Sequence, residues 1–92
     1  MKNNTVVTVV TVSGEYVGRL DIVHSDGAIT LKDPRMLIHG DQGIGFARGV
    51  CMTSRENPET IKFQQYVLCT ETNDDFSAAW SEAISGLKLV VS

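Results

Sequence analysis

The stretch TVSGEYVGRLDIVHSDGAITL, residues Thr11–Leu31, carries the strongest indication of the fold. It contains two glycines, Gly14 and Gly18, and a turn sequence at Ser25-Asp26-Gly27. A glycine inside a strand gives up packing, and it usually marks a bend, a bulge or a close backbone approach. Gly18 falls inside the predicted strand Tyr16–His24, and sharply bent strands close small barrels. This stretch therefore favours a barrel over a flat sheet.

Runs of apolar and β-branched residues predict five strands in all. Thr5–Val12 reads TVVTVVTV, and consecutive β-branched residues fit a pleated sheet better than a helix. Because this run does not alternate with polar residues, we expect burial on both faces, with a neighbouring subunit covering one of them. Asp33-Pro34-Arg35 interrupts the third strand, since proline lacks the N–H that a sheet ladder needs. The other strands are expected at Tyr16–His24, Ala28–Lys32, Ile44–Thr53 and Thr60–Thr70.

The last part of the chain changes from strand to helix periodicity. The apolar residues at helical spacing are Phe76, Ala79, Trp80, Ala83, Ile84 and Leu87. Thr72 or Asn73 can cap this helix, Gly86 suits its C-terminal cap, and we interpret Trp80 as a core anchor. The predicted architecture is a single domain over residues 1–92 that is mainly β. It consists of a small, five-stranded, strongly bent open barrel of the SH3-like kind at residues 5–71, a helix at 74–86 and a short tail strand at 87–91.

Composition excludes several classes of protein. With 92 residues, 42% of them hydrophobic, the chain has room for one small core, and disorder is a poor explanation. No apolar run reaches the ~20 residues of a membrane helix and no signal-peptide pattern is present, so a cytoplasmic location is expected. Cys51 and Cys69 are single, and His24 and His39 lack nearby acidic ligands, so we expect no metal site and no cofactor. Patterned nucleophiles and a phosphate loop are also missing, so no enzymatic activity is expected.

The net charge of −3 comes from the C-terminal part of the chain. Residues 1–70 hold seven Lys/Arg and seven Asp/Glu, whereas residues 71–92 hold four Asp/Glu against Lys88 alone. A general nucleic-acid binder carries a basic surface, which this composition does not supply. Any polyanion would therefore have to meet a local basic patch.

The spacing of the two glycines resembles the first motif of the Sm and Sm-like family. In that motif a strand leads to two glycines with three residues between them, then a leucine, a turn and a closing hydrophobic pair. The matching residues are Gly14, Gly18, Leu20, Ile22, Ile29 and Leu31. Phe46-Ala47-Arg48-Gly49 is similar to the arginine–glycine of the family's second motif. The segment LKDPRMLI at Leu31–Ile38, followed by two strands and a C-terminal helix, is similar to short Sm-like proteins encoded by tailed phages.

The resemblance implies a five-stranded Sm-like barrel that assembles into a homo-oligomeric ring of about five to seven subunits. If a phage encodes it, the ring would lie in the cytoplasm of a bacterial host. In such a ring the fourth strand of one subunit pairs with the fifth strand of the next, which agrees with the exposed edges of an open barrel. The residues expected at the subunit interface are Ile44, Phe46, Val50, Met52, Ile61, Phe63 and Val67.

The uridine pocket of the RNA-binding family members is not reproduced in this chain. Those members carry an aspartate, then an aromatic residue, His or Met, and then an asparagine around the turn after the second strand. Here the same places hold His24, Gly27 and Ala28. Gly27 offers no stacking face, and Ala28 cannot form a hydrogen bond with a base edge. The usual helix also precedes the barrel in that family, whereas here it follows.

Two functions remain open from the sequence. One is a ring that binds single-stranded RNA weakly and without uridine specificity, mainly through positive charges repeated around the ring. The expected contact residues are His24, Lys32, Arg35, Arg48 and Arg55. The other is a structural or protein-interaction ring without nucleic-acid binding, which Gly27, Ala28 and the acidic C-terminal segment favour.

Overall fold

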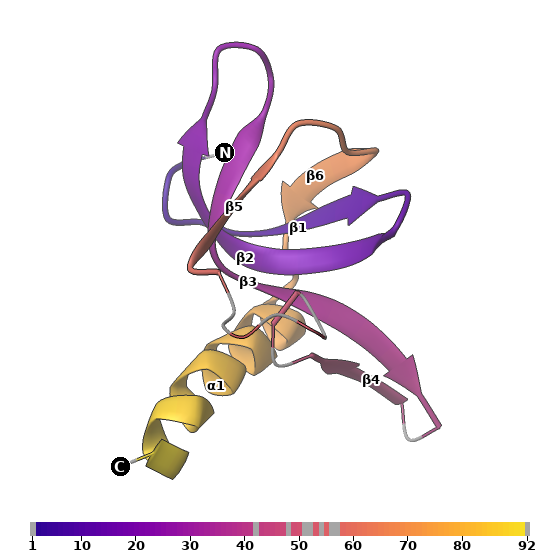
Figure 1. The fold of residues 1–92 in the computed structure, drawn as a ribbon, viewed down its shortest axis with the longest axis vertical. Helices are drawn as coiled ribbons and strands as arrows, with labels where there is room; N and C mark the ends of the chain where they lie inside the picture. The colour runs from indigo at the N-terminus through magenta and orange to yellow at the C-terminus, as the bar shows by residue number, and fades with distance from the viewer. Residues whose placement is uncertain are drawn as a thin grey trace.

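Antiparallel strands and one C-terminal helix make up the described part of the molecule (Figure 1). The computed structural model describes residues 2–41, 43–47, 49–50, 53, 55 and 58–91. The strands pair in the order β4-β3-β2-β1-β6, and β5 also pairs with β3. The mainly β class with a C-terminal helix is therefore confirmed, as an open antiparallel sheet. The elements are β1 (Val6–Thr11), β2 (Gly14–Val23), β3 (Ile29–Gly40), β4 (Gly43–Phe46), β5 (Thr60–Phe63), β6 (Leu68–Glu71) and α1 (Asp74–Val91).

β4 and β5 both lie along β3, one beyond the other. β4 lies opposite Leu37–Gly40, β5 lies opposite Ile29–Lys32, and both run antiparallel to β3. Between these two pairings, the backbone of Met36 forms hydrogen bonds with Ala47 and Gly49. β4 and β5 therefore lie one after the other beside β3, and Ala47 and Gly49 continue the backbone contact with β3 beyond the end of β4.

This arrangement corrects the strand count to six within the described residues. The predicted strand Thr60–Thr70 is divided, because the chain turns between Phe63 and Leu68 and then crosses to pair with β1. The predicted strand Ile44–Thr53 is represented by β4, which ends at Phe46. Beyond Phe46, Ala47 and Gly49 still form backbone hydrogen bonds with Met36 of β3.

β3 runs through Pro34, where the sequence predicted an interruption. Asp33 has a positive φ of 50°, and its N–H donates to the Glu59 carbonyl at 2.7 Å. Pro34 has no N–H to place in the ladder, and the register of β2 against β3 shifts nearby, between Val17 and Arg19. An irregularity of this kind allows a proline inside a long strand. The predicted break is therefore wrong, and the strand continues to Gly40.

Gly18 allows β2 and β3 to approach closely. A Cβ at this position would lie 3.0 Å from the carbonyl oxygen of Lys32 and 3.2 Å from Cβ of Leu31. The sequence predicted a bend at Gly18, and the structure shows a close approach there together with a shift of register between Val17 and Arg19. The core is formed by Val7, Val9, Leu20, Ile29, Leu31 and Phe63.

β1 is less completely covered than its sequence indicated. Val7 and Val9 are fully buried, whereas the alternate residues Val6, Thr8 and Val10 are half-buried. One face of the strand thus belongs to the core. The expectation of burial on both faces is met only in part within a single chain.

The end of β3 and the whole of β4 form a two-stranded arm, defined here as Leu37–Gly40 paired with Gly43–Phe46. Figure 1 shows this arm projecting away from the centre of the sheet. β2 pairs with β3 only as far as Met36, so no third described strand supports the arm. The rings of Phe46 and Phe76 brace it against α1 in an edge-on contact, with their centroids 6.2 Å apart.

α1 is fixed to the sheet near its N-terminal end. Asn73 caps the helix, since its Oδ1 accepts a hydrogen bond from the Phe76 N–H at 2.9 Å. Trp80 is fully buried, and its indole N–H donates to the Asp33 carbonyl at 2.9 Å. The guanidinium of Arg19 lies 5.3 Å from the centroid of the Trp80 ring. The interpretation of Trp80 as a core anchor is confirmed.

α1 extends further than predicted, to Val91. The sequence placed the end of the helix at residue 86, followed by a tail strand at 87–91. A glycine inside a helix costs only about 1 kcal/mol relative to alanine, and the leucines and lysine that follow Gly86 are good helix formers. The tail strand is therefore wrong. Among the helical residues that the structure describes, no span is long and apolar enough to cross a membrane.

Candidate functional site

His24, the first of the residues expected to contact RNA, helps to fix the turn between β2 and β3. Its Nε2 lies 2.8 Å from Oγ1 of Thr30, and its backbone N–H donates to the Ala28 carbonyl. On the same turn, Oδ1 of Asp26 accepts a hydrogen bond from the Ala28 N–H at 3.0 Å. This hydrogen bond lowers the pKa of the Asp26 carboxyl. The turn is thus held by its own hydrogen bonds, in which both His24 and Ala28 take part.

Lys32 remains accessible on β3. Its Nζ lies 3.8 Å from Oδ1 of Asp21, and about half of its side chain (51%) is exposed. A surface ion pair of this kind contributes about 0–1 kcal/mol, so it restrains the lysine only weakly. Lys32 can therefore still meet an anion in solution.

Arg35 is buried, in contrast to the expectation that it offers a surface contact. It is only 8% exposed and pairs across the ladder with Val17, which is 1% exposed. Its Nη1 donates to the Pro34 carbonyl at 3.3 Å, and its Nε has no hydrogen-bond partner among the described residues. Because paired residues share a face of the sheet, Arg35 lies on a covered face. Its expected role as a surface contact to phosphate is therefore corrected.

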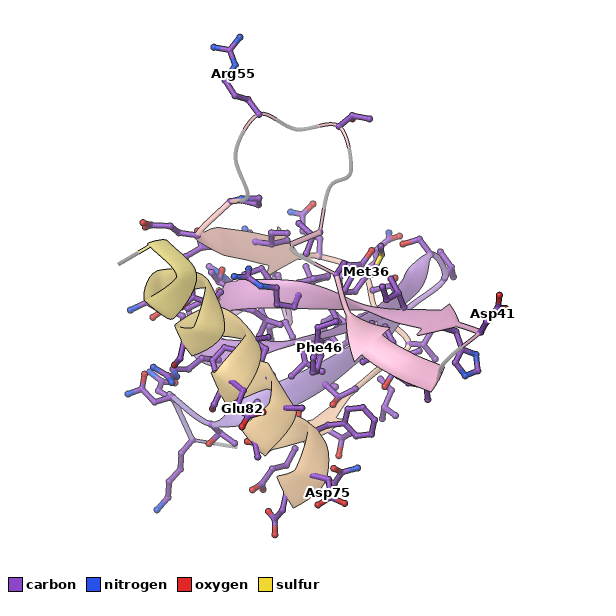
Figure 2. All side chains as sticks on the ribbon, turned by 90° about the horizontal axis from the view of Figure 1, so that it is seen from below. Met36, Asp41, Phe46, Arg55, Asp75 and Glu82 are labelled. Carbon is purple, nitrogen blue, oxygen red and sulfur yellow. The ribbon has the colours of Figure 1, made fainter. Side chains whose placement is uncertain are left out.

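The remaining two expected RNA contacts belong to the segment between β4 and β5. Arg48 lies outside the described residues. Arg55 is exposed, and Figure 2 shows it projecting away from both the sheet and the helix. The expected contact residues that the structure describes thus come from three separate segments, namely the turn after β2, β3 and the segment between β4 and β5.

The residues expected at a subunit interface divide into two groups. Phe63 is 9% exposed and belongs to the core, where its ring lies 5.3 Å from that of Tyr16. Ile61 packs against the same core, and Phe46 packs on α1, so these three residues act mainly inside one chain. Because these three side chains pack inward, apolar and polar residues alternate along their strands in the sequence.

Ile44 and Val67 are the expected interface residues that remain available. Ile44 is 50% exposed on β4, and Val67 is 71% exposed in the turn before β6. Val50 is half-buried, and Met52 lies outside the described residues. Ile44 thus lies on β4 and Val67 lies just before β6, and these two strands stand at opposite ends of the strand order.

Several exposed apolar residues were not predicted from the sequence. Ile38 on the arm is 47% exposed, Leu68 on β6 is 51% exposed, and Val23 at the end of β2 is 58% exposed. Their exposure follows from which strands lie at the margins of the sheet, and the sequence does not show the order of the strands. The pair Val67-Leu68 next to a turn was the available signal for an exposed apolar edge.

A hollow of about 660 Å³ opens beside β6, between this strand and the ends of β2 and β3. We call it the hollow, and its apolar lining consists of Leu20, Val23, Ile29, Val67, Leu68 and Cys69. Partial burial raises the pKa of the Cys69 thiol, so the neutral thiol is favoured. Tyr66 borders the hollow and donates from its hydroxyl group to the Gly27 carbonyl at 2.7 Å. The hollow therefore lies over the buried core residues Leu20 and Ile29 and is bordered by the exposed side chains of Val23, Val67 and Leu68.

No family model, curated protein or solved structure matches the chain. The likeness to the Sm-like family thus rests on the motif residues of the sequence. Within the described ranges, no group of three or more His, Cys, Asp or Glu residues is placed to hold a metal ion. The features that the fold does offer are two sheet edges and the apolar residues along them.

Proposed function

We propose that the protein is an Sm-like, ring-forming homo-oligomer whose main role is structural, as a protein-interaction ring. The observation that supports the proposal is the presence of two sheet edges that pair with no further strand in the described part of the chain, one on β4 and β5 and the other on β6. Half-exposed apolar residues, including Ile44 and Leu68, lie along these edges. An exposed edge strand presents free N–H and C=O groups and is a template for pairing with another chain.

The two edges are different surfaces, so pairing them joins neighbouring copies head to tail. Contacts of this type form a closed ring when the rotation between copies closes, and an open filament when it does not. A ring leaves no sheet edge exposed, which removes the hazard of further edge-to-edge association. We therefore propose a closed ring of about five to seven subunits.

Weak RNA binding is the second candidate function. Lys32 and Arg55 are exposed, and a ring would repeat each of them in every subunit. Repetition strengthens a weak phosphate contact. Against this candidate, Arg35 is buried and each copy adds a net charge of −3. The balance of these charges favours the structural role.

The proposal is tested by the mass of the native assembly at micromolar concentration. We expect one discrete oligomer for the parent chain. Ile44→Lys should shift it to the monomer, because a lysine on the edge must lose its water when the edges pair. Val12→Lys is the matched control, since Val12 lies in the β1–β2 turn with 99% exposure and should leave the mass unchanged.

Circular dichroism separates loss of assembly from loss of folding. Ile44→Lys should keep the parent spectrum, because half of the Ile44 side chain already meets solvent. Phe63→Lys would test the core instead, since Phe63 is buried. A parent chain that stays monomeric under these conditions would contradict the proposed ring.

A further inference from the structure

A cleft opens between the arm, the start of β2 and the start of α1. It consists of two adjoining recesses of about 280 and 200 Å³, and Glu15, Leu37 and Ile44 line both of them. The smaller recess also reaches Thr8, Val17, Thr72, Asn73 and Phe76. We call the two recesses together the cleft, and all of its walls belong to one chain.

The cleft exists because the arm leaves β2 behind. β2 pairs with β3 only as far as Met36, so Leu37 has no described strand beside it on the β2 side. Leu37 pairs with Phe46 on the other side, and the ring of Phe46 contacts that of Phe76 on α1. This face of the arm is therefore turned toward the helix, and the aromatic contact fixes the far wall of the cleft.

The cleft places several hydrogen-bond acceptors around one space. The Oγ1 atoms of Thr8 and Thr72 lie 2.9 Å apart, and Thr72 is only 8% exposed. This contact uses one hydroxyl proton, so the pair keeps lone pairs that can accept from an N–H group. Thr8 lies opposite Val17, which makes Glu15 its diagonal neighbour, about 7–8 Å away and within reach of a long side chain.

The charge of the cleft and its margins is negative. Among the described residues that line it, Glu15 is the charged one, and neither lysine nor arginine is present. Exposed Asp74 and Asp75 follow Asn73 at one margin, and exposed Asp41 lies at the free end of the arm (Figure 2). The positive end of the helix dipole amounts to about half a charge, which these two carboxylates outweigh. A cation is therefore favoured there over an anion.

We propose that the cleft binds an arginine side chain from a segment of another protein. The arginine stem packs on Leu37 and Phe76, and its guanidinium meets Glu15 and the hydroxyl pair of Thr8 and Thr72. Arginine fits this lining because it carries five N–H donors and no acceptor, and its apolar stem can be buried while its head group stays polar. The inference goes beyond the proposed ring, because the cleft is complete in a single copy.

An NMR titration of the ¹⁵N-labelled full chain tests the proposal. The probe is the capped peptide Gly-Leu-Arg-Leu-Gly, added at low salt up to millimolar concentration. The control peptide carries citrulline in place of arginine, which keeps the shape and removes the positive charge. We expect the arginine peptide to shift the amide signals of Glu15, Leu37, Thr72 and Asn73, and the citrulline peptide to bind more weakly.

Two variants locate the contact within the cleft. Glu15→Gln keeps the size of the side chain and should weaken binding about three- to tenfold, because a charge-assisted hydrogen bond is lost. Thr8→Val should also weaken binding, since it removes a hydroxyl acceptor. Glu82→Gln is the matched control, because exposed Glu82 lies on α1 and does not line the cleft, so the affinity should stay within about twofold of the parent.

The outcomes separate this inference from the proposed ring. Localised shifts that weaken in Glu15→Gln would support the cleft, even in a parent chain that proves monomeric and so overturns the ring. Equal affinity for the citrulline peptide, or an unchanged affinity of Glu15→Gln, would overturn the cleft. The absence of amide shifts at millimolar peptide would do the same, while a discrete native oligomer would leave the ring standing.

Discussion

At the scale of single residues, Gly18 is a position where a larger side chain would meet the backbone of a neighbouring strand. The carbonyl oxygen of Lys32 is backbone and cannot rotate away from a Cβ built 3.0 Å from it, and Leu31 lies at 3.2 Å on the same side. Gly18→Val should therefore lower the free energy of unfolding by about 1–3 kcal/mol, as overpacking of a core does. Chemical denaturation measures the change.

Gly45→Ala provides the control for this prediction. A Cβ at Gly45 meets nothing within 4 Å, so alanine there should leave the stability within about 0.5 kcal/mol of the parent. Equal stabilities of the Gly18→Val variant and the parent would show that the sheet bends at another residue.

Arg35 shows why the candidate site was less predictable than the strand pattern. The sequence placed this arginine next to a proline, and proline normally lies at the edge or end of a strand. In the structure the positive φ of Asp33 carries the strand through Pro34, and Arg35 becomes the partner of buried Val17. Whether a charged side chain is covered depends on packing between distant segments, which periodicity does not encode.

At the scale of elements, α1 is held to the sheet by Trp80. Its ring is fully buried, and its N–H satisfies the carbonyl of Asp33, the residue with positive φ in β3. Trp80→Phe keeps most of the apolar contact but leaves this carbonyl without its donor, so we expect a loss of about 1–3 kcal/mol in the free energy of unfolding. Trp80→Ala should cost more, about 3–5 kcal/mol, because it also opens a cavity.

Glu82→Ala is the control on the same helix, since Glu82 is exposed. It should change the stability by no more than about 0.5 kcal/mol. Urea denaturation of the three variants should therefore rank Glu82→Ala, Trp80→Phe and Trp80→Ala in order of increasing loss. A Trp80→Phe variant as stable as the parent would show that the indole hydrogen bond is not what fixes α1.

The elements that were predicted correctly are those with a strong local pattern. The β-branched run became β1, and the helical spacing around Trp80 became α1 with Asn73 as its cap. The errors concern pairing and ends. Residues Thr60–Thr70 alternate as one strand would, yet the chain turns between Phe63 and Leu68 because its two halves pair with different partners, β3 and β1.

At the scale of the whole molecule, the distribution of charge decides whether an assembly would hold RNA. Figure 2 shows Arg55 projecting on the opposite side of the molecule from Asp75 at the start of α1. Lys32 is half-exposed on β3. Exposed positive charges are therefore available away from the acidic start of the helix, but they come from separate segments. Such contacts hold phosphate without reading bases.

Any RNA binding should therefore be weak, indifferent to base and steeply dependent on salt. Titration of oligo-U, oligo-A and single-stranded DNA at low salt should give similar affinities that fall together as salt rises. For single strands the slope of log K against log salt is about −0.7 for each phosphate contact, so Arg55→Glu and Lys32→Glu should each reduce the slope. Ser13→Glu, exposed in the β1–β2 turn, is the control that adds negative charge without removing an expected contact.

A tight preference for oligo-U would contradict the argument from Gly27 and Ala28, because neither residue can stack on a uracil or hydrogen-bond its edge through a side chain. Absence of binding to all three polymers at low salt would leave the structural ring as the function, because charge is the main attraction that this surface can offer.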